Sequence, residues 1–278
     1  MALVEDIKQA NIKIFESNQE MLANDERAQR CIDTSIKRQE FIGKDSLIPW
    51  KERFTEPAKV IVSRRSTLDA ARHYREGKTA VLNFASATNP GGGVLKGSSA
   101  QEECICRCST LYNCLNTEEM MKRFYQPHRN AHNQLNNDDI IYTPYVLVTL
   151  DDSYNLLEST DMVDVITCAA PNLRPDKDGK EIEISSEDLY ELHQKRATRI
   201  LAAAAAHNVD NIILGAFGCG AFKNDPYVVA KAYKTVLPRF LKCFKNIEFA
   251  VLYKNDRDVK NYLAFGETLV GPKGVHYK

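Results

Sequence analysis

The first 45 residues alternate apolar and charged positions at the spacing of an α-helix. A second predicted helix follows, spanning Met21–Arg38, and the first carries the apolar residues Leu3, Ile7, Ile12, Ile14 and Phe15. A helix with one apolar stripe packs that stripe against another surface. We therefore expect residues 1–45 to form a helical accessory extension that covers a hydrophobic surface of the main body, residues 46–278.

Beyond this extension, short apolar runs rich in β-branched residues predict buried strands. Six such strands are expected, at Ala58–Ser63, Thr79–Phe84, Tyr145–Leu150, Val163–Ala169, Ile212–Leu214 and Ile247–Tyr253. Stretches of helical spacing separate most of them, so we expect an α/β layered domain with a largely parallel sheet.

The predicted helices begin at recognisable caps. Ser66 precedes a helix over Thr67–Tyr74, and Asp225 followed by Pro226 precedes one from about Tyr227 to Leu241. A third starts at Ser185 or Ser186 and includes the alanines at 202–206. Two further helices are expected, one directly after the first glycine-rich stretch and one over Asp256–Phe265. Residues 116–137 are expected to form a helix and a long surface loop, and residues 171–184 an exposed crossing.

Charge and composition narrow the functional classes. Lys+Arg and Asp+Glu both number 37, so the formal net charge is zero and no general nucleic-acid binding is expected. No apolar run approaches the ~20 residues of a membrane span, and the N-terminus lacks the pattern of a signal peptide. We expect a soluble intracellular monomer that is cytoplasmic, with the nucleus as the other compartment open to it, and that has no membrane partner.

The eight cysteines are expected to be reduced thiols. Cys104, Cys106, Cys108 and Cys114 cluster without the paired spacing of zinc ribbons. The alternative is a metal site made of Cys104 and Cys108 with His128 or His132, although histidines in this polar stretch are more typical of solvated loops. Reduced thiols with no metal and no cofactor are the preferred interpretation.

Two glycine-rich stretches follow predicted strands. The first contains Gly91–Gly93 and, after seven intervening residues, Gln101, Glu102 and Glu103; the second is the run Leu214–Pro226, with Gly218 and Gly220. Glycines let a bulky anion approach the backbone, and a strand, a glycine turn and a helix N-terminus form a phosphate site. Ligands of such sheets bind beyond the carboxyl ends of strands, so we expect both loops to contribute to one site.

Together these two motifs resemble the bacterial-type poly(ADP-ribose) glycohydrolases, which are macrodomain enzymes. The residues Cys106–Tyr112 after the first motif also resemble that family's continuation. The resemblance covers roughly residues 58–265 and implies a macrodomain-like three-layer α/β/α fold with a mixed, mostly parallel sheet.

The resemblance implies cleavage of the ribose–ribose O-glycosidic bond of poly(ADP-ribose), with ADP-ribose as the product. A carboxyl group must protonate the leaving oxygen and then take a proton from water. The resemblance makes Glu103 that acid/base group, and it gives Glu102 a supporting catalytic role. Neighbouring helix residues point about 100° apart, so we expect only one of the two to face the scissile oxygen.

Ligand contacts are implied for residues of both loops. One or both of Asn83 and Asn89 would bind ribose hydroxyls, and the first loop would surround the distal ribose and diphosphate. The second loop would hold the diphosphate, and Phe222 would pack on the terminal ribose. The complete set of expected binding residues is Asn83, Asn89, Gly91, Gly92, Gly93, Val94, Gln101, Gly218, Cys219, Gly220, Ala221 and Phe222.

Each motif also has an ordinary structural interpretation. Ser99 and Glu102 fit a capping box, and the second loop fits a plain tight turn. Asn89 before Pro90 fits a turn, and Phe222 fits a core residue. Two other functions remain open: hydrolysis of single ADP-ribosyl groups on protein or nucleic acid, and ADP-ribose binding without turnover. The intact pair of glutamates argues against a pure binding module.

Overall fold

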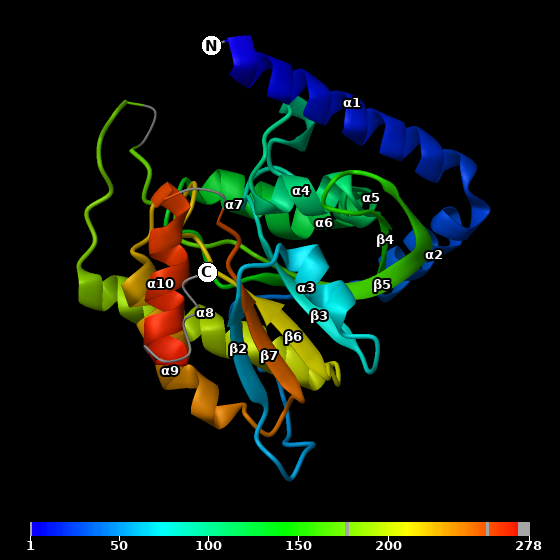
Figure 1. Cartoon of the computed structure of the whole chain (residues 1–278). Helices are drawn as coiled ribbons and strands as arrows, with labels where there is room; N and C mark the ends of the chain where they lie inside the picture. The colour runs from blue at the N-terminus through cyan, green and yellow to red at the C-terminus, as the bar shows by residue number, and fades with distance from the viewer. Residues whose placement is uncertain (1, 176–177, 254–255, 272–278) are drawn as a thin grey trace. The chain divides into compact units, whose positions relative to one another are not determined.

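The computed structural model describes residues 2–175, 178–253 and 256–271 (Figure 1). The chain forms two compact units. The first comprises Met1–Lys44, Asn83–Asn133 and Asp139–Ala169, and the second comprises Asp45–Leu82, Gln134–Asp138 and Ala170–Lys278.

The first unit contains an antiparallel set of strands with helices around it. Strand β4 pairs on one side with β1 and on the other with β5, both antiparallel. Its strands are β1 (Glu40–Ile42), β4 (Ile140–Leu150) and β5 (Leu156–Cys168). Its helices are α1 (Ala2–Asn24), α2 (Glu26–Arg38), η1 (Val94–Lys96), α4 (Gln101–Arg107), α5 (Leu111–Leu115), α6 (Glu118–Met120), the π-helical η2 (Met121–Tyr125) and α7 (Gln126–Ala131).

The second unit is built on parallel pairing. β7 lies between β6 and β2, and β6 also pairs with β3, all in parallel. The strands are β2 (Lys59–Ser63), β3 (Thr79–Phe84), β6 (Asn211–Leu214) and β7 (Asn246–Ala250). The last two residues of β3, Asn83 and Phe84, belong to the first unit. The helices are α3 (Thr67–His73), α8 (Ser186–Ala206), α9 (Pro226–Val236), η3 (Leu237–Arg239) and α10 (Asp256–Leu269).

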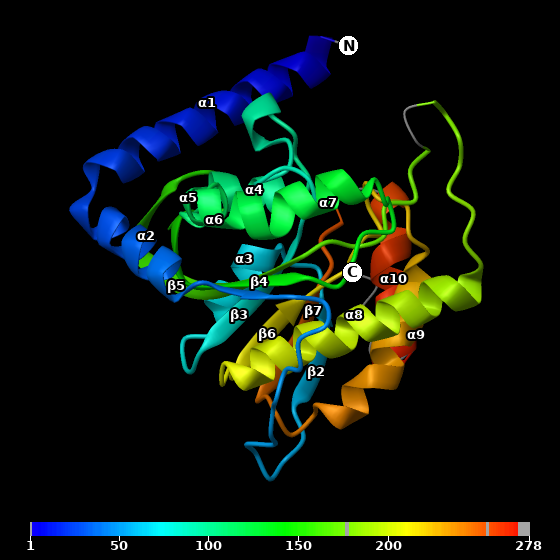
Figure 2. The ribbon, with the colours of Figure 1, turned by 180° about the vertical axis from the view of Figure 1, so that it is seen from behind.

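Within the second unit, α3 and α8 lie on opposite faces of the strands (Figures 1 and 2). Helix α8 presents a face of buried residues at spacings of three and four, among them His193, Arg196, Ala197 and Ile200. Helix α9 packs against α8, and α10 packs against α9. The long helix that carries the alanine run therefore supplies buried side chains close to the strands.

The predicted caps are confirmed. Ser66 Oγ accepts a hydrogen bond from Asp69 N, Ser185 Oγ accepts one from Asp188 N, and Asp225 Oδ1 accepts one from Tyr227 N. The predicted strand Thr79–Phe84 is observed with the same bounds. Local capping chemistry thus located three helix starts without tertiary information.

Other boundaries were wrong. The second N-terminal helix starts at Glu26 rather than Met21, because Asp25 Oδ1 caps it through Arg27 N and Ala28 N. The helix predicted to reach Leu241 leaves α geometry after Val236, where the next turn, with Pro238, is 3₁₀. Strands β4 and β5 are longer than predicted because they pair along most of their length, and β1 was not predicted.

None of the helices in the described ranges is both long and apolar enough to cross a membrane.

Candidate functional site

The first glycine loop begins where β3 ends. Asn83 lies on β3 and is fully buried, and the loop from Ala85 leads through η1 into α4. Gln101, the first residue of α4, accepts a hydrogen bond at its Oε1 from Phe84 N at 2.9 Å. The start of the Gln-Glu-Glu motif is thus hydrogen-bonded directly to the end of the strand.

Glu102 is buried and has a partner on each carboxyl oxygen. Its Oε2 accepts from Ser86 N at 2.7 Å, and its Oε1 accepts from Asn83 Nδ2 at 3.3 Å. Burial, helped by the nearby Glu103 charge, raises the pKa of Glu102 to about 8 against the opposing effect of the Ser86 hydrogen bond. Near neutral pH this carboxyl is therefore mostly protonated.

Glu103 is also buried but keeps one oxygen unused. Its Oε1 accepts from Gly93 N at 2.7 Å. Its Oε2 has no hydrogen-bond partner among the described residues. A buried carboxyl oxygen without a partner is costly in a resting protein, so this atom is the one available to a substrate hydroxyl or to water.

Both carboxyl groups approach the same glycine. A Cβ atom on Gly92 would lie 2.5 Å from Glu103 Oε1 and 2.9 Å from Glu102 Oε2. Gly92 has φ 59°, a left-handed conformation that glycine adopts without strain. Both side chains therefore lie against Gly92, although their Cα–Cβ bonds point about 100° apart. The expectation that only one of them faces the scissile oxygen stays a prediction.

The backbone amides of the first loop are already engaged. Gly92 N donates to Asn89 O, Gly93 N to Glu103, and Val94 N to Gly91 O. The Gly91 backbone also forms a hydrogen bond to Glu102, which lowers the pKa of that carboxyl. The amides of this loop, which was expected to hold ribose and diphosphate, therefore already have acceptors within the chain.

The remaining predicted residues of this loop take ordinary positions. The Val94 side chain is fully buried, and Asn89 is exposed. Asn89 Nδ2 donates to Thr88 Oγ1 at 3.1 Å, and its Oδ1 accepts from Arg129 Nη2 at 3.4 Å. Asn83 Oδ1 is buried and has no partner within the described part of the chain.

The capping box was wrong. The N-cap of α4 is Ala100, which cannot cap with its side chain, and Ser99 lies outside the helix. Glu102 turns its carboxylate to Ser86 N instead. The burial of Glu102 and Glu103 is therefore unrelated to helix capping, which removes the ordinary structural explanation for this pair.

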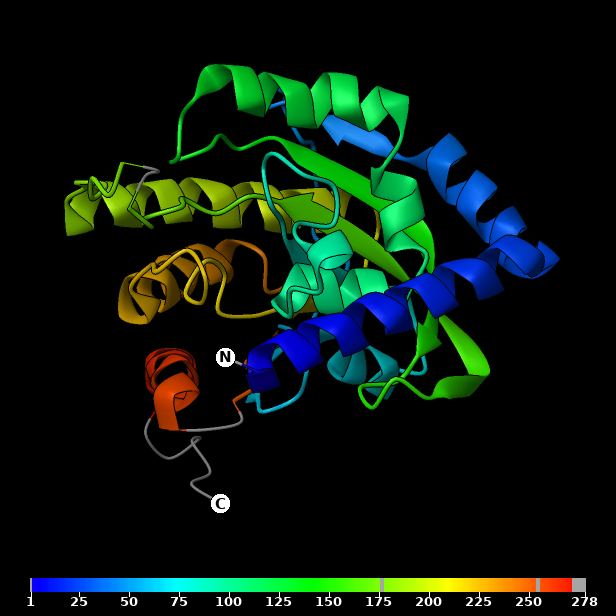
Figure 3. The ribbon, with the colours of Figure 1, turned by 90° about the horizontal axis from the view of Figure 1, so that it is seen from above.

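Helix α1 supports the turn after the triple glycine (Figure 3). Asn11 Nδ2 donates to Gly97 O at 2.9 Å, and both Asn11 and Gly97 are buried. A Cβ on Gly97, whose φ is 71°, would lie 2.3 Å from Lys8 O. The backbone of α1 thus lies directly against the segment that joins the glycines to the glutamates.

The second glycine loop lies in the other unit, between β6 and α9. Gly218 is buried with φ 77°, and Gly220 and Ala221 are exposed. Cys219 N donates to Ala216 O and Lys223 N to Gly220 O, but the amides of Gly220, Ala221 and Phe222 have no acceptor among the described residues. Such a row of free N–H groups before a helix N-terminus is suited to an anion.

Phe222 is not a core residue. It is half-buried, and the Arg174 guanidinium lies 5.3 Å from the centre of its ring. A partly exposed ring beside the free amides fits the expected ribose contact, which stays a prediction, as does the expectation that the two loops form one site.

The cysteine–histidine alternative receives no support. No group of three or more His, Cys, Asp or Glu side chains in the described ranges is placed to hold a metal ion. The eight cysteines are free thiols. His128 was wrongly expected in a solvated loop; it is buried on α7, where its Nδ1 lies 2.7 Å from Phe124 O.

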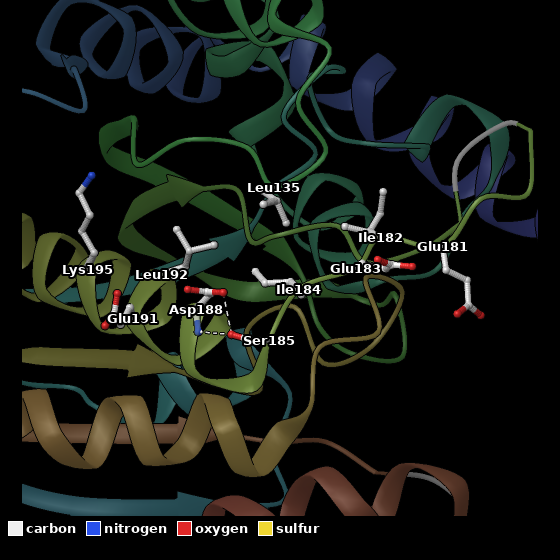
Figure 4. A pocket seen from close by; sticks show the side chains of 10 residues that line it. All are labelled: Leu135, Glu181, Ile182, Glu183, Ile184, Ser185, Asp188, Glu191, Leu192 and Lys195. Atoms are coloured by element: carbon white, nitrogen blue, oxygen red, sulfur yellow. Dashed lines mark hydrogen bonds between the residues drawn. The ribbon is translucent and has the colours of Figure 1, made fainter.

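A separate hollow of about 950 Å³ lies at the start of α8 (Figure 4). Its walls include four acidic side chains, and Ser185 bonds to Asp188 there as the helix cap. The acidic residues are Glu181, Glu183, Asp188 and Glu191. Several negative charges around one lysine, Lys195, disfavour a diphosphate, so we do not assign this hollow to the nucleotide.

Sequence patterns missed the residues that hold the two motifs in place. Ser86 and Thr167 support Glu102 and Asn83 in the first loop. Asn224 and His193 support the second loop. Asn224 lies inside the second motif and could have been noticed there, whereas His193 has no local signal, because only the fold brings α8 to this loop.

Comparisons with known proteins agree with this geometry. Residues 8–151 match the family model described as microbial-type PARG, catalytic domain. A comparison with curated protein sequences gave no match.

Solved structures of bacterial poly(ADP-ribose) glycohydrolases are similar to the chain over most of its length. The enzyme from Thermomonospora curvata is 29% identical with a TM-score of 0.82, covering 94% of this chain and 99% of that one. The enzyme from Deinococcus radiodurans in complex with ADP-ribose is 31% identical with a TM-score of 0.76, covering 86% and 96%.

These similarities confirm the predicted α/β fold with its mixed sheet. The family model spans the Gly-Gly-Gly and Gln-Glu-Glu motif. The chain belongs to the family of microbial-type poly(ADP-ribose) glycohydrolase catalytic domains.

Proposed function

We propose that the protein hydrolyses the ribose–ribose O-glycosidic bond of poly(ADP-ribose) and releases ADP-ribose. Family membership supports the reaction class, and the observation that carries the residue assignment is the buried, unpartnered Oε2 of Glu103 beside Gly92 and Gly93. Both oxygens of Glu102 already have partners. Glu103 is therefore the group free to exchange a proton with the substrate.

In this mechanism the protonated form of Glu103 gives its proton to the leaving ribose oxygen as the bond breaks. The oxocarbenium-like centre is then attacked by a water whose proton Glu103 accepts, so the carboxyl returns to its starting state. The chemistry requires a carboxyl and water, with no step that needs a metal ion.

Glu102 supports the reaction by carrying a proton of its own. Because burial raises its pKa to about 8, Glu102 is mostly uncharged at pH 7. That lowers the repulsion between the glutamates and the substrate diphosphate. Ser86 and Asn83, which bind Glu102, keep this carboxyl out of the way of the reacting atoms.

The second loop takes the diphosphate in this proposal. Its free amides at Gly220, Ala221 and Phe222 supply donors, and the buried Gly218 and the half-buried Cys219 form the base of the loop. We further propose a cytoplasmic monomer in which residues 1–45 are an accessory segment of the catalytic domain, 46–278.

The test is to incubate the purified protein with labelled poly(ADP-ribose) and, separately, with mono-ADP-ribosylated protein, and to resolve the products. Conversion of the polymer to ADP-ribose is expected. Unchanged polymer together with cleaved mono-modified protein would assign a mono(ADP-ribosyl) hydrolase instead. Binding of ADP-ribose with no turnover of either substrate would assign a binding module.

A further inference from the structure

The second glycine loop is held from behind by one asparagine. Asn224 is buried, and its Nδ2 lies 2.9 Å from Gly218 O and 3.2 Å from Phe222 O, the carbonyls at the two ends of the loop. The same Nδ2 atom also lies 2.7 Å from Pro171 O. One amide group therefore fixes both ends of the segment whose central amides are free.

Gly218 leaves room for this contact. Its φ is 77°, and a Cβ there would lie 2.7 Å from Asn224 Nδ2 and 2.7 Å from Ala170 Cβ. At Gly220 a Cβ would meet no atom within 4 Å. The loop is thus tightly packed on the Asn224 side and open on the side of its free amides.

Asn224 is in turn oriented by a histidine from α8. His193 Nε2 lies 2.9 Å from Asn224 Oδ1, and the ring is buried. Because the amide nitrogen of Asn224 faces three carbonyls, its oxygen faces the histidine, so Nε2 must carry the proton and donate it. The ring also packs edge-on against Phe217, with 6.1 Å between centroids.

The histidine is suited to a fixed donor role. Burial lowers the pKa of His193 to about 4, so the ring stays neutral with a single N–H at physiological pH. Its Nδ1 is buried and has no partner in the described part of the chain. The proton therefore has one partnered position, on Nε2, and the orientation of Asn224 is set by it.

We propose that His193 and Asn224 are positioning residues for the substrate diphosphate, acting through the carbonyls of Gly218 and Phe222 to hold the free amides of the second loop in place. This rests on the proposed function, because it assumes that the loop takes the diphosphate. Neither residue is expected to touch the substrate. Their contribution is to fix the loop before the ligand arrives, which lowers the entropy lost on binding.

The test compares two substitutions of one residue. His193→Gln keeps an N–H donor that can reach Asn224 Oδ1, whereas His193→Leu fills the space and removes the donor. We expect His193→Leu to weaken ADP-ribose binding about 10- to 100-fold, by analogy with the loss seen when residues that orient metal ligands are removed. His193→Gln should recover most of the affinity. Calorimetry with ADP-ribose measures both, after circular dichroism has established that each variant is folded.

Kinetics separate positioning from general damage. His193→Leu should raise KM for the polymer while kcat at saturation changes less than threefold, because the glutamates belong to the other loop. Equal affinities in the leucine variant and the wild type would overturn the proposal. Equal losses in the leucine and glutamine variants, or a fall in kcat without a rise in KM, would also overturn it.

A ligand-free measurement keeps this proposal distinct from the proposed function. Hydrogen exchange of the peptide covering 216–224 should speed up in His193→Leu, because the Cys219 and Asn224 amides bond within the loop. Faster exchange in a protein that never binds ADP-ribose would refute the nucleotide function and the diphosphate role, whereas the role of His193 and Asn224 in holding the loop would stand. Unchanged exchange would refute the role of His193 in holding the loop, whatever the protein binds.

Discussion

The two glycine loops are held by opposite kinds of polar group. In the first loop, buried carboxyl groups accept hydrogen bonds from backbone N–H groups, as at Gly93 and Ser86. In the second, the Asn224 amide donates to backbone carbonyls, as at Gly218 and Phe222. The first arrangement uses up amides and leaves a carboxyl oxygen free, whereas the second uses up carbonyls and leaves amides free.

This difference assigns complementary chemistry to two motifs that look alike in sequence. A free carboxyl oxygen exchanges protons, and free amides bind anions. Glycine serves a different purpose in each loop. Gly92 makes room for two carboxyl groups, and Gly220 leaves an open side where a ligand can approach the backbone.

The largest effect is expected at Glu103. Glu103→Gln keeps the size of the side chain and an oxygen that can accept from Gly93 N, but it cannot transfer a proton. Turnover of poly(ADP-ribose) should fall by ~10²- to 10⁴-fold while ADP-ribose still binds. Product release from labelled polymer and calorimetry measure the two quantities. Near-wild-type turnover in this variant would remove proton transfer from the first loop.

The next largest effect is expected at Gly220. Gly220→Val places a branched side chain on the open face of the second loop, where it meets no protein atom within 4 Å. ADP-ribose affinity should therefore fall at least about tenfold, equivalent to about 1.4 kcal/mol, while the melting temperature is nearly unchanged. The matched control is Gly218→Ala, whose Cβ would clash with Asn224 and should lower the melting temperature. Unchanged affinity in Gly220→Val would separate this loop from the nucleotide.

A smaller effect on turnover, with a clear pH signature, is expected at Glu102. Its folded pKa of about 8 lies above the value of about 4.3 for an unfolded glutamate, so the folded protein binds more protons between these values. The contribution of Glu102 to stability is present below about pH 4 and is lost as the pH rises to about 8. Glu102→Gln should leave turnover reduced but measurable and should flatten this part of the stability profile.

Urea unfolding of wild type and Glu102→Gln at intervals from pH 5 to 8.5 measures this slope. Glu103→Gln, assayed in parallel, controls for the loss of one carboxyl from the pair. Wild-type and Glu102→Gln curves that run parallel across this range would contradict the raised pKa.

The smallest effect is expected from chelators. Because the proposed mechanism uses a carboxyl and water, EDTA should leave turnover unchanged. Metal analysis of the purified protein should find no stoichiometric zinc. About one zinc per chain, together with chelator-sensitive turnover, would contradict the mechanism and return attention to Cys104 and Cys108.

Local chemistry determined much of this protein from its sequence. Capping residues located the starts of α3, α8 and α9, and the apolar run Thr79–Phe84 gave β3 its observed bounds. Order and spacing of the two glycine motifs identified the family. These features depend on a few neighbouring residues, so they are readable without knowing what lies across the fold.

Only the tertiary structure decided how the motif residues are used. Whether Glu102 caps a helix or meets Ser86 N depends on how β3 and α4 come together, and its raised pKa depends on burial that no pattern specifies. The support of Gly97 by α1 and of Asn224 by His193 likewise joins residues 86 and 31 positions apart. Hydrogen bonds across such separations form only after the chain has packed, because sequence spacing carries no information about which distant side chain will fill a given space.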